Sequence, residues 1–66
     1  MKWTTQIQNY QITIKENEDR VFDVDIEHLG YGQKTILWFV SLASAKRYIK
    51  TEYGEKDERI KWTKVT

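Results

Sequence analysis

Two consecutive stretches of this chain alternate apolar and polar residues with a period of two. Their apolar positions, in residues 8–16 and 22–27, are Tyr10, Ile12, Ile14, Phe22, Val24 and Ile26. Successive side chains of a strand point to opposite faces of a sheet, so this period predicts two half-buried strands. Asn17, Glu18 and Asp19 supply a polar turn between the two stretches. We therefore expect the two strands to form a hairpin.

A third stretch, residues 35–40, is apolar after its first residue. Its two alternating sets of side chains are Ile36, Trp38 and Val40 on one face, and Leu37 and Phe39 on the other. Strands that are apolar on both faces are typical of positions covered from both sides. The pattern predicts a strand at the centre of the sheet, or one that is covered on both faces.

Helical spacing begins after residue 41. The apolar residues that recur at intervals of three and four are Leu42, Ala45, Tyr48, Ile49 and Tyr53. Ser41 stands where an N-terminal capping residue belongs, and Gly54 stands where a C-terminal glycine belongs. The spacing predicts a helix over residues 42–53.

The two ends of the chain carry shorter patterns. Residues 3–7 are a further short strand or an arm, and residues 55–59 are a charged connection. Ile60 and Trp62 alternate with polar neighbours, which predicts a last short strand. Together the elements predict an α+β fold, a small mostly antiparallel sheet of about four strands with one helix packed on it, in the order β-β-β-α-β. The predicted core residues are Tyr10, Ile12, Ile14, Phe22, Val24, Ile26, Trp38, Leu42, Ala45, Ile49, Ile60 and Trp62.

The chain has 66 residues, no cysteine and one histidine. This length favours a single domain, residues 1–66. Without cysteine no disulfide or thiolate zinc site is available, and one histidine supplies too few nitrogen ligands for an ordinary zinc site. We therefore predict no cofactor and no metal. Stability has to come from packing, for which nine aromatic residues provide apolar area, or from a partner.

The net charge of +1 conceals a segregation of charge along the chain. Residues 15–27 carry six acids and two bases, a net charge of −4, whereas residues 28–51 carry four bases and no acid, a net charge of +4. The predicted hairpin is therefore acidic and the predicted helix is basic. A partner is expected to meet local fields of opposite sign rather than one global field.

Asp23, Asp25 and Glu27 recur at every second position, so we expect their carboxylates on one face of the strand, about 7 Å apart. Three interpretations remain open. The row forms a solvated outer face whose charges discourage association of sheet edges, or it binds a basic partner, or it holds a divalent cation. No glycine-bearing calcium loop accompanies the row, which disfavours the cation. The three residues are the candidate partner-binding site.

Lys46, Arg47 and Lys50 are expected to project from one side of the predicted helix, opposite its apolar residues. With Lys34 in the nearby glycine loop they are candidate phosphate contacts of a nucleic-acid-binding surface. The competing interpretation is a solvated helix face whose cations complement the helix dipole. Tyr31, between two glycines, is a candidate ring for stacking on a base.

Nucleophilic catalysis needs a base within hydrogen-bond reach of a nucleophile. The only imidazole, His28, continues an apolar strand face, and no spacing pairs it with a serine or threonine. A pocket of about 300 Å³ would also be a large void in so small a domain. We therefore predict that the protein is not an enzyme. The sequence shows neither an apolar run long enough to span a membrane nor a signal peptide, so we expect a cytoplasmic protein.

The segment Phe39–Lys50 has the form aromatic-x-Ser-Leu-x-x-Ala-Lys-x-Tyr-Ile. It resembles the strand-to-helix junction of many small uncharacterised phage and mobile-element proteins. The order of three strands and a helix is also similar to the sheet-reading DNA-binding domains of plant transcription factors and of phage integrase N-termini. Those domains present basic and aromatic residues on the exposed sheet, whereas this chain presents Asp23, Asp25 and Glu27 there. The acids argue against DNA binding through the sheet.

These observations predict a non-catalytic accessory or regulatory module, encoded by a phage or mobile element, that binds another protein or a second copy of itself. One helix covers only one face of a sheet, so part of the second face, including Leu37 and Phe39, is expected to stay open for that partner. The alternative function is nucleic-acid binding through Lys34 and the helix cations. A third possibility is an obligate dimer whose separate halves have no activity.

Overall fold

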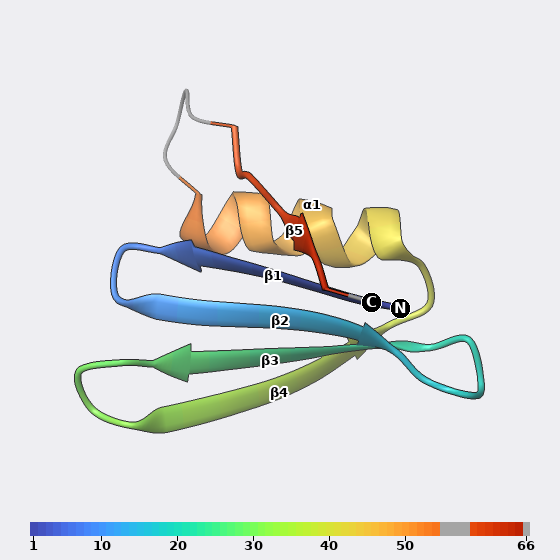
Figure 1. Cartoon of the computed structure of the whole chain (residues 1–66), viewed down its shortest axis with the longest axis horizontal. Coiled ribbons are helices and arrows are strands. Elements are labelled where there is room, and N and C mark those ends of the chain that lie inside the picture. Colours follow the sequence, from blue (N-terminus) through green and yellow to red (C-terminus); the bar gives the residue numbers. More distant parts are fainter. Residues whose placement is uncertain (55–58, 66) are drawn as a thin grey trace.

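The computed structural model describes residues 1–54 and 59–65. Its elements, in chain order, are β1 (Lys2–Ile7), β2 (Tyr10–Glu16), β3 (Phe22–His28), β4 (Gln33–Phe39), α1 (Leu42–Tyr53) and β5 (Thr63–Lys64). The strands form one sheet in the order β4-β3-β2-β1-β5, and every neighbouring pair is antiparallel (Figure 1). The α+β prediction is confirmed, with the order β-β-β-β-α-β because the N-terminal segment is a strand rather than an arm.

The hairpin predicted from the alternating pattern lies at the centre of this sheet. β2 and β3 pair over the full length of both strands. The Asn17 side chain organises the turn between them, because its Oδ1 accepts hydrogen bonds from the backbone N–H groups of Asp19 (2.8 Å) and Val21 (3.2 Å). An Asx turn of this kind lets the polar segment reverse the chain without a glycine.

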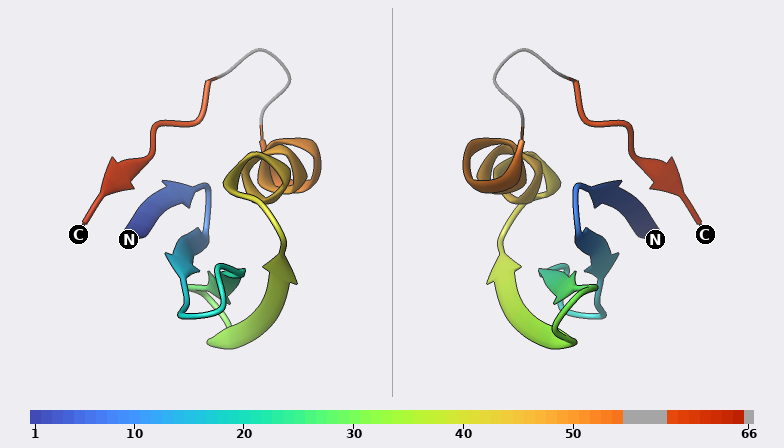
Figure 2. Two further views of the ribbon diagram at one scale, coloured as in Figure 1. Left: turned by 90° about the vertical axis from the view of Figure 1, so that its right-hand side faces the viewer. Right: turned by 90° about the vertical axis from the view of Figure 1, so that its left-hand side faces the viewer.

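The hydrophobic core lies between α1 and the face of the sheet that α1 covers. Figure 2 shows the helix in the hollow of the curved sheet, with β4 and β5 at the two ends of the curve. The fully buried apolar side chains are Ile12, Ile14, Val24, Ile26, Ala45 and Ile49. All six were predicted from the periods of the strands and the helix.

Aromatic side chains close the margins of the core. The rings of Trp3 and Phe22 have centroids 6.2 Å apart, and those of Phe39 and Tyr48 are 5.4 Å apart. The predicted core residues that are partly buried here are Tyr10, Phe22, Leu42, Ile60 and Trp62. The prediction is wrong for Trp38, whose side chain is 66% exposed.

Strand β4 is an edge strand, so the prediction that it is central or covered on both faces is wrong. Leu37 lies opposite the buried Val24, and Phe39 lies opposite Phe22, which places both on the helix side of the sheet. Leu37 and Phe39 were expected on the open face, and Trp38 in the core, so the two faces of β4 are the reverse of the prediction. The alternating pattern defines two sets of side chains but does not say which set meets the helix.

Both predicted helix boundaries are confirmed, although Gly54 acts for a different reason than expected. Ser41 caps the N-terminus, since its Oγ accepts a hydrogen bond from the backbone N–H of Ser44 at 3.1 Å. Gly54 has φ −75° and is therefore outside the left-handed region. A Cβ atom on Gly54 would lie 2.6 Å from the carbonyl oxygen of Lys50, so close approach requires the glycine.

The C-terminal strand lies later in the chain than predicted. β5 is Thr63–Lys64 and pairs with Thr4 and Trp3 of β1, whereas Ile60 and Trp62 pack against the core without belonging to a strand. Alternating side chains predict a strand wherever one side of the chain is buried. The pattern does not show whether the backbone there pairs with another strand. Residues 55–58 of the predicted charged connection lie outside the described residues.

Candidate interaction surface

The sheet has a face that α1 does not cover, which we call the outer face. The acids Asp23, Asp25 and Glu27 of β3 all lie on it, since they alternate with the buried Val24 and Ile26. Directly opposite them on β4 are Trp38, Ile36 and Lys34, respectively. Directly opposite residues on one face have Cβ atoms about 4.5–5.5 Å apart. The structure therefore brings the predicted acidic row together with the apolar side chains that the helix leaves uncovered.

The apolar part of this surface is strongly exposed. Ile36 is 71% exposed and Trp38 is 66% exposed, and Val40, which follows β4, is 74% exposed. We call Ile36 and Trp38 the apolar pair of the outer face. The sequence held a signal for this exposure, because a single helix covers one face of a sheet and β4 has an apolar set on each face. One of the two sets had to remain in water.

Lysines flank the acidic row on both sides. Lys15 of β2 lies opposite Asp23, and the Lys34 ammonium lies 3.6 Å from an Asp25 carboxylate oxygen. Together with Lys2, which lies opposite Lys15, three lysines on this face balance the three acids of the row. Of these three lysines only Lys34 belongs to the basic stretch of the sequence, so strand pairing brings one of the four cations of that stretch beside the acidic row.

The carboxylate of Asp23 is held in place by the neighbouring turn. The Nδ2 group of Asn17 donates a hydrogen bond of 3.3 Å to Oδ2 of Asp23, while Oδ1 of the same side chain accepts from the turn backbone. The amide thus connects the turn to the acidic row. Asp23 stands beside Trp38 as a pre-positioned acceptor at one end of the row.

The predicted phosphate contacts do not form one surface. Lys34 lies on the outer face, on the opposite side of the sheet from α1. Lys46 of the helix is half-buried, and its Nζ lies 6.0 Å from the centre of the Trp62 ring, an arrangement typical of a cation–π interaction. Arg47 and Lys50 are exposed on the helix. The structure keeps three of the four cations on one element but turns Lys46 toward the C-terminal segment.

Tyr31 lies at the tip of the β3–β4 hairpin and is 80% exposed. Its ring centroid is 4.7 Å from that of His28, and its backbone N–H donates a hydrogen bond of 3.2 Å to Nδ1 of His28. The His28 ring also meets Tyr10 edge to face, with centroids 4.9 Å apart. His28 organises the hairpin tip.

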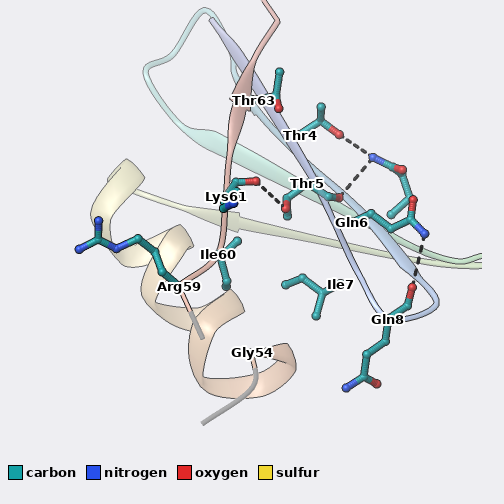
Figure 3. A pocket seen from close by; sticks show the side chains of 11 residues that line it. Thr4, Thr5, Gln6, Ile7, Gln8, Gly54, Arg59, Ile60, Lys61 and Thr63 are labelled. Carbon is teal, nitrogen blue, oxygen red and sulfur yellow. Dashed lines mark hydrogen bonds between the residues drawn. The ribbon is translucent and has the colours of Figure 1, made fainter. Parts of the chain in front are cut away.

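A surface groove of about 850 Å³ lies between β1 and residues 59–61, which precede β5 (Figure 3). The groove is open to solvent and is not a void inside the core. Thr5 of β1 spans the groove, since its Oγ1 donates a hydrogen bond of 2.9 Å to the carbonyl oxygen of Lys61. The charged groups among its lining residues are Arg59 and Lys61, both cations, so the described lining offers no acid–base pair.

No cluster of three or more histidine, cysteine, aspartate or glutamate side chains able to hold a metal ion occurs in residues 1–54 and 59–65. Within the same ranges, no helix has the length and apolar character that a membrane span requires.

Comparison with known proteins found no family model, no curated protein and no solved structure that matches this chain.

Proposed function

We propose that this protein is a non-catalytic accessory module that acts by binding another protein through its outer face. One observation carries the proposal: the exposed apolar pair, Ile36 and Trp38, lies directly opposite the carboxylates of Asp25 and Asp23. The proposal retains two expectations from the sequence, that the module works in the cytoplasm and that a phage or mobile element encodes it.

The composition of this surface fits a protein interface. Tryptophan is among the residues most enriched at the energetic centres of interfaces, where it fills a pocket of the partner. Charged groups usually surround such a centre and set the specificity of the contact. Trp38 is such an apolar centre, and Asp23 and Asp25 are the polar groups beside it. The partner is expected to offer an apolar pocket bordered by hydrogen-bond donors.

Nucleic-acid binding, the alternative, has less support from the geometry. Phosphate-dominated binding needs several cations that reach one backbone at the same time. The candidates are divided, because Lys34 lies on the outer face beside Asp25 and Lys46 lies against Trp62. Arg47 and Lys50 alone form a small footprint, so we favour a protein partner.

Site-specific photo-crosslinking tests the proposal. A benzophenone amino acid replaces Trp38 in one variant and Arg47, which is exposed on the helix, in a matched control. After irradiation in a bacterial lysate, position 38 is expected to yield adducts with another protein that position 47 does not yield. Adducts between two copies of the chain are identified by mass and counted separately. Identical adducts from both positions, or no heterologous adduct from position 38, would overturn the proposal.

A further inference from the structure

The two edge strands of the sheet differ in length. On one side the sheet ends in β5, which has two residues, and on the other it ends in β4, which has seven. No described strand or helix pairs with the free edge of β4, and Figure 1 shows no described element beyond it. An edge strand presents a row of backbone N–H and C=O groups that a further strand can pair with.

We infer that a second copy of this chain occupies the free edge of β4, with the two β4 strands antiparallel about a two-fold axis. The pairing joins two five-stranded sheets into one continuous sheet. It rests on the proposed function, because it joins the two outer faces and sets their apolar pairs side by side at the centre. The partner of the proposed function then meets twice the apolar area that one chain offers.

Strand β4 has only one of the features that normally protect an edge from pairing, a single lysine. Natural edge strands are blunted by proline, by β-bulges or by charged side chains. The chain contains no proline, and β4 pairs with β3 in an unbroken register from Gln33 to Phe39, so no bulge interrupts it. Its one charged residue, Lys34, lies 3.6 Å from Asp25 of the same chain, which offsets its charge while its side chain stays exposed.

The sequence of β4 is complementary to itself when two copies run antiparallel. Lys34 and Trp38 are equally far from Ile36, so a two-fold axis at Ile36 places Lys34 of each copy opposite Trp38 of the other. Lysine and tryptophan attract each other by the cation–π interaction, and this chain already uses that pair in Lys46 and Trp62. The pairing is isologous and occurs twice.

The charges of the outer face also favour a second copy of this chain, rather than a strongly charged strand of another protein, as the occupant of the β4 edge. The described strand residues of the outer face include three lysines and three acids, so two such faces do not repel each other as wholes. A polybasic or polyacidic strand would find no net field of the opposite sign there. The apolar pair, moreover, lies on the edge strand, which favours joining edge to edge over stacking two outer faces.

A single cysteine tests the register directly, because the natural chain has none. In the Ile36→Cys variant the two thiols face each other across the axis, with Cα atoms about 4.5–5.5 Å apart, within the range of a disulfide. Thr13→Cys places a thiol on the same face, two strands from the edge. We expect mild oxidation to convert Ile36→Cys to a covalent dimer and to leave Thr13→Cys monomeric. Equal amounts of dimer from both variants would overturn the register.

Sedimentation equilibrium of the natural chain and of two lysine variants completes the test. The natural chain is expected to move from 8.0 kDa to twice that mass as its concentration rises. Ile36→Lys sets two ammonium groups against each other at the axis and is expected to lose the dimer, whereas Thr13→Lys is expected to retain it. A natural chain that stays at 8.0 kDa, or a dimer unaffected by Ile36→Lys, would overturn self-pairing. If the dimer is absent in these experiments but position 38 still cross-links another protein, the self-pairing inference is overturned and the proposed function stands.

Discussion

The Lys34 ammonium lies 3.6 Å from an Asp25 carboxylate oxygen, across neighbouring strands of the outer face. The contact joins a residue predicted to meet phosphate with one predicted to meet a protein partner. Both side chains are exposed, and exposed ion pairs contribute only about 0–1 kcal/mol to stability. The charges of this face are thus available for specificity, since the free energy of folding depends little on them.

The exposure of Trp38 predicts that its removal costs little stability. We expect Trp38→Ser to change the free energy of unfolding by about 0.5 kcal/mol or less, as is usual for exposed sites. Ile49→Ala, which empties a fully buried position, is expected to cost about 2–5 kcal/mol. Urea unfolding of both variants, followed by circular dichroism, measures the difference. Equal losses would show that Trp38 is part of the core.

The environment of Tyr53 predicts a loss of stability at alkaline pH. Burial, reinforced by Tyr48, Tyr10 and Glu52, raises the pKa of the Tyr53 phenol above its ordinary value of 10.0. The folded state therefore holds this proton more tightly than the unfolded state. The resulting stabilisation is fully present below pH 10 and is lost as the pH rises through the folded-state pKa. The melting temperature is expected to fall above pH 10.

A phenylalanine variant isolates this contribution. Tyr53→Phe keeps the ring that meets Tyr10 at 4.9 Å but removes the ionisable group. We expect the variant to lose less of its melting temperature than the natural protein between pH 9 and pH 11, about one unit either side of the ordinary tyrosine pKa. Tyr31→Phe, at an exposed position, is the matched control and should leave the alkaline loss unchanged. An identical alkaline profile for Tyr53→Phe would contradict the prediction.

The close contact at Gly54 predicts that alanine there weakens the end of the helix. The added Cβ would lie 2.6 Å from the Lys50 carbonyl oxygen, which is backbone and must move to make room. We expect Gly54→Ala to destabilise the protein by about 1 kcal/mol, the centre of the range for point substitutions. Thermal unfolding measures the loss. Thr51→Ala, at an exposed position inside the helix, is the control and is expected to be neutral or stabilising.

The divided cations predict weak interaction with nucleic acid. In titrations against labelled single- and double-stranded DNA and RNA at about 50 and 200 mM salt, we expect no binding that weakens steeply with salt. The Arg47→Gln, Lys50→Gln double variant is expected to match the natural chain at both salt concentrations. Tight binding at the lower salt that the double variant loses would instead support the alternative function.

The sequence predicted the strands and the helix better than it predicted which elements lie next to each other in the fold. Periods of two and of three to four residues identify β2, β3 and α1 because each has one apolar set, which must meet the core. β4 has two apolar sets, so its pattern cannot distinguish the face that meets the helix from the face that meets water. The same ambiguity placed Trp38 in the core and left Leu37 and Phe39 on the open face.

The candidate surface was predicted only in its acidic half. The alternation of Asp23, Asp25 and Glu27 with buried residues fixes their face of β3 from the sequence alone. The apolar pair beside them depends on the pairing of β3 with β4, which is a relation between segments that no local pattern contains. Charge summed along the chain does not show the position of Lys34 for the same reason, since Lys34 meets the acids only once β3 and β4 are paired.

The shortness of β5 limits how far the sheet can grow by pairing between the edge strands of different copies. A sheet with two long open edges adds copies without end and grows into a fibre. Here the strand at the far edge, among the residues that the structure describes, has only two residues, Thr63 and Lys64. If two copies pair through β4 as we propose, that pairing uses the long edge of each chain, and the assembly is expected to end at two copies.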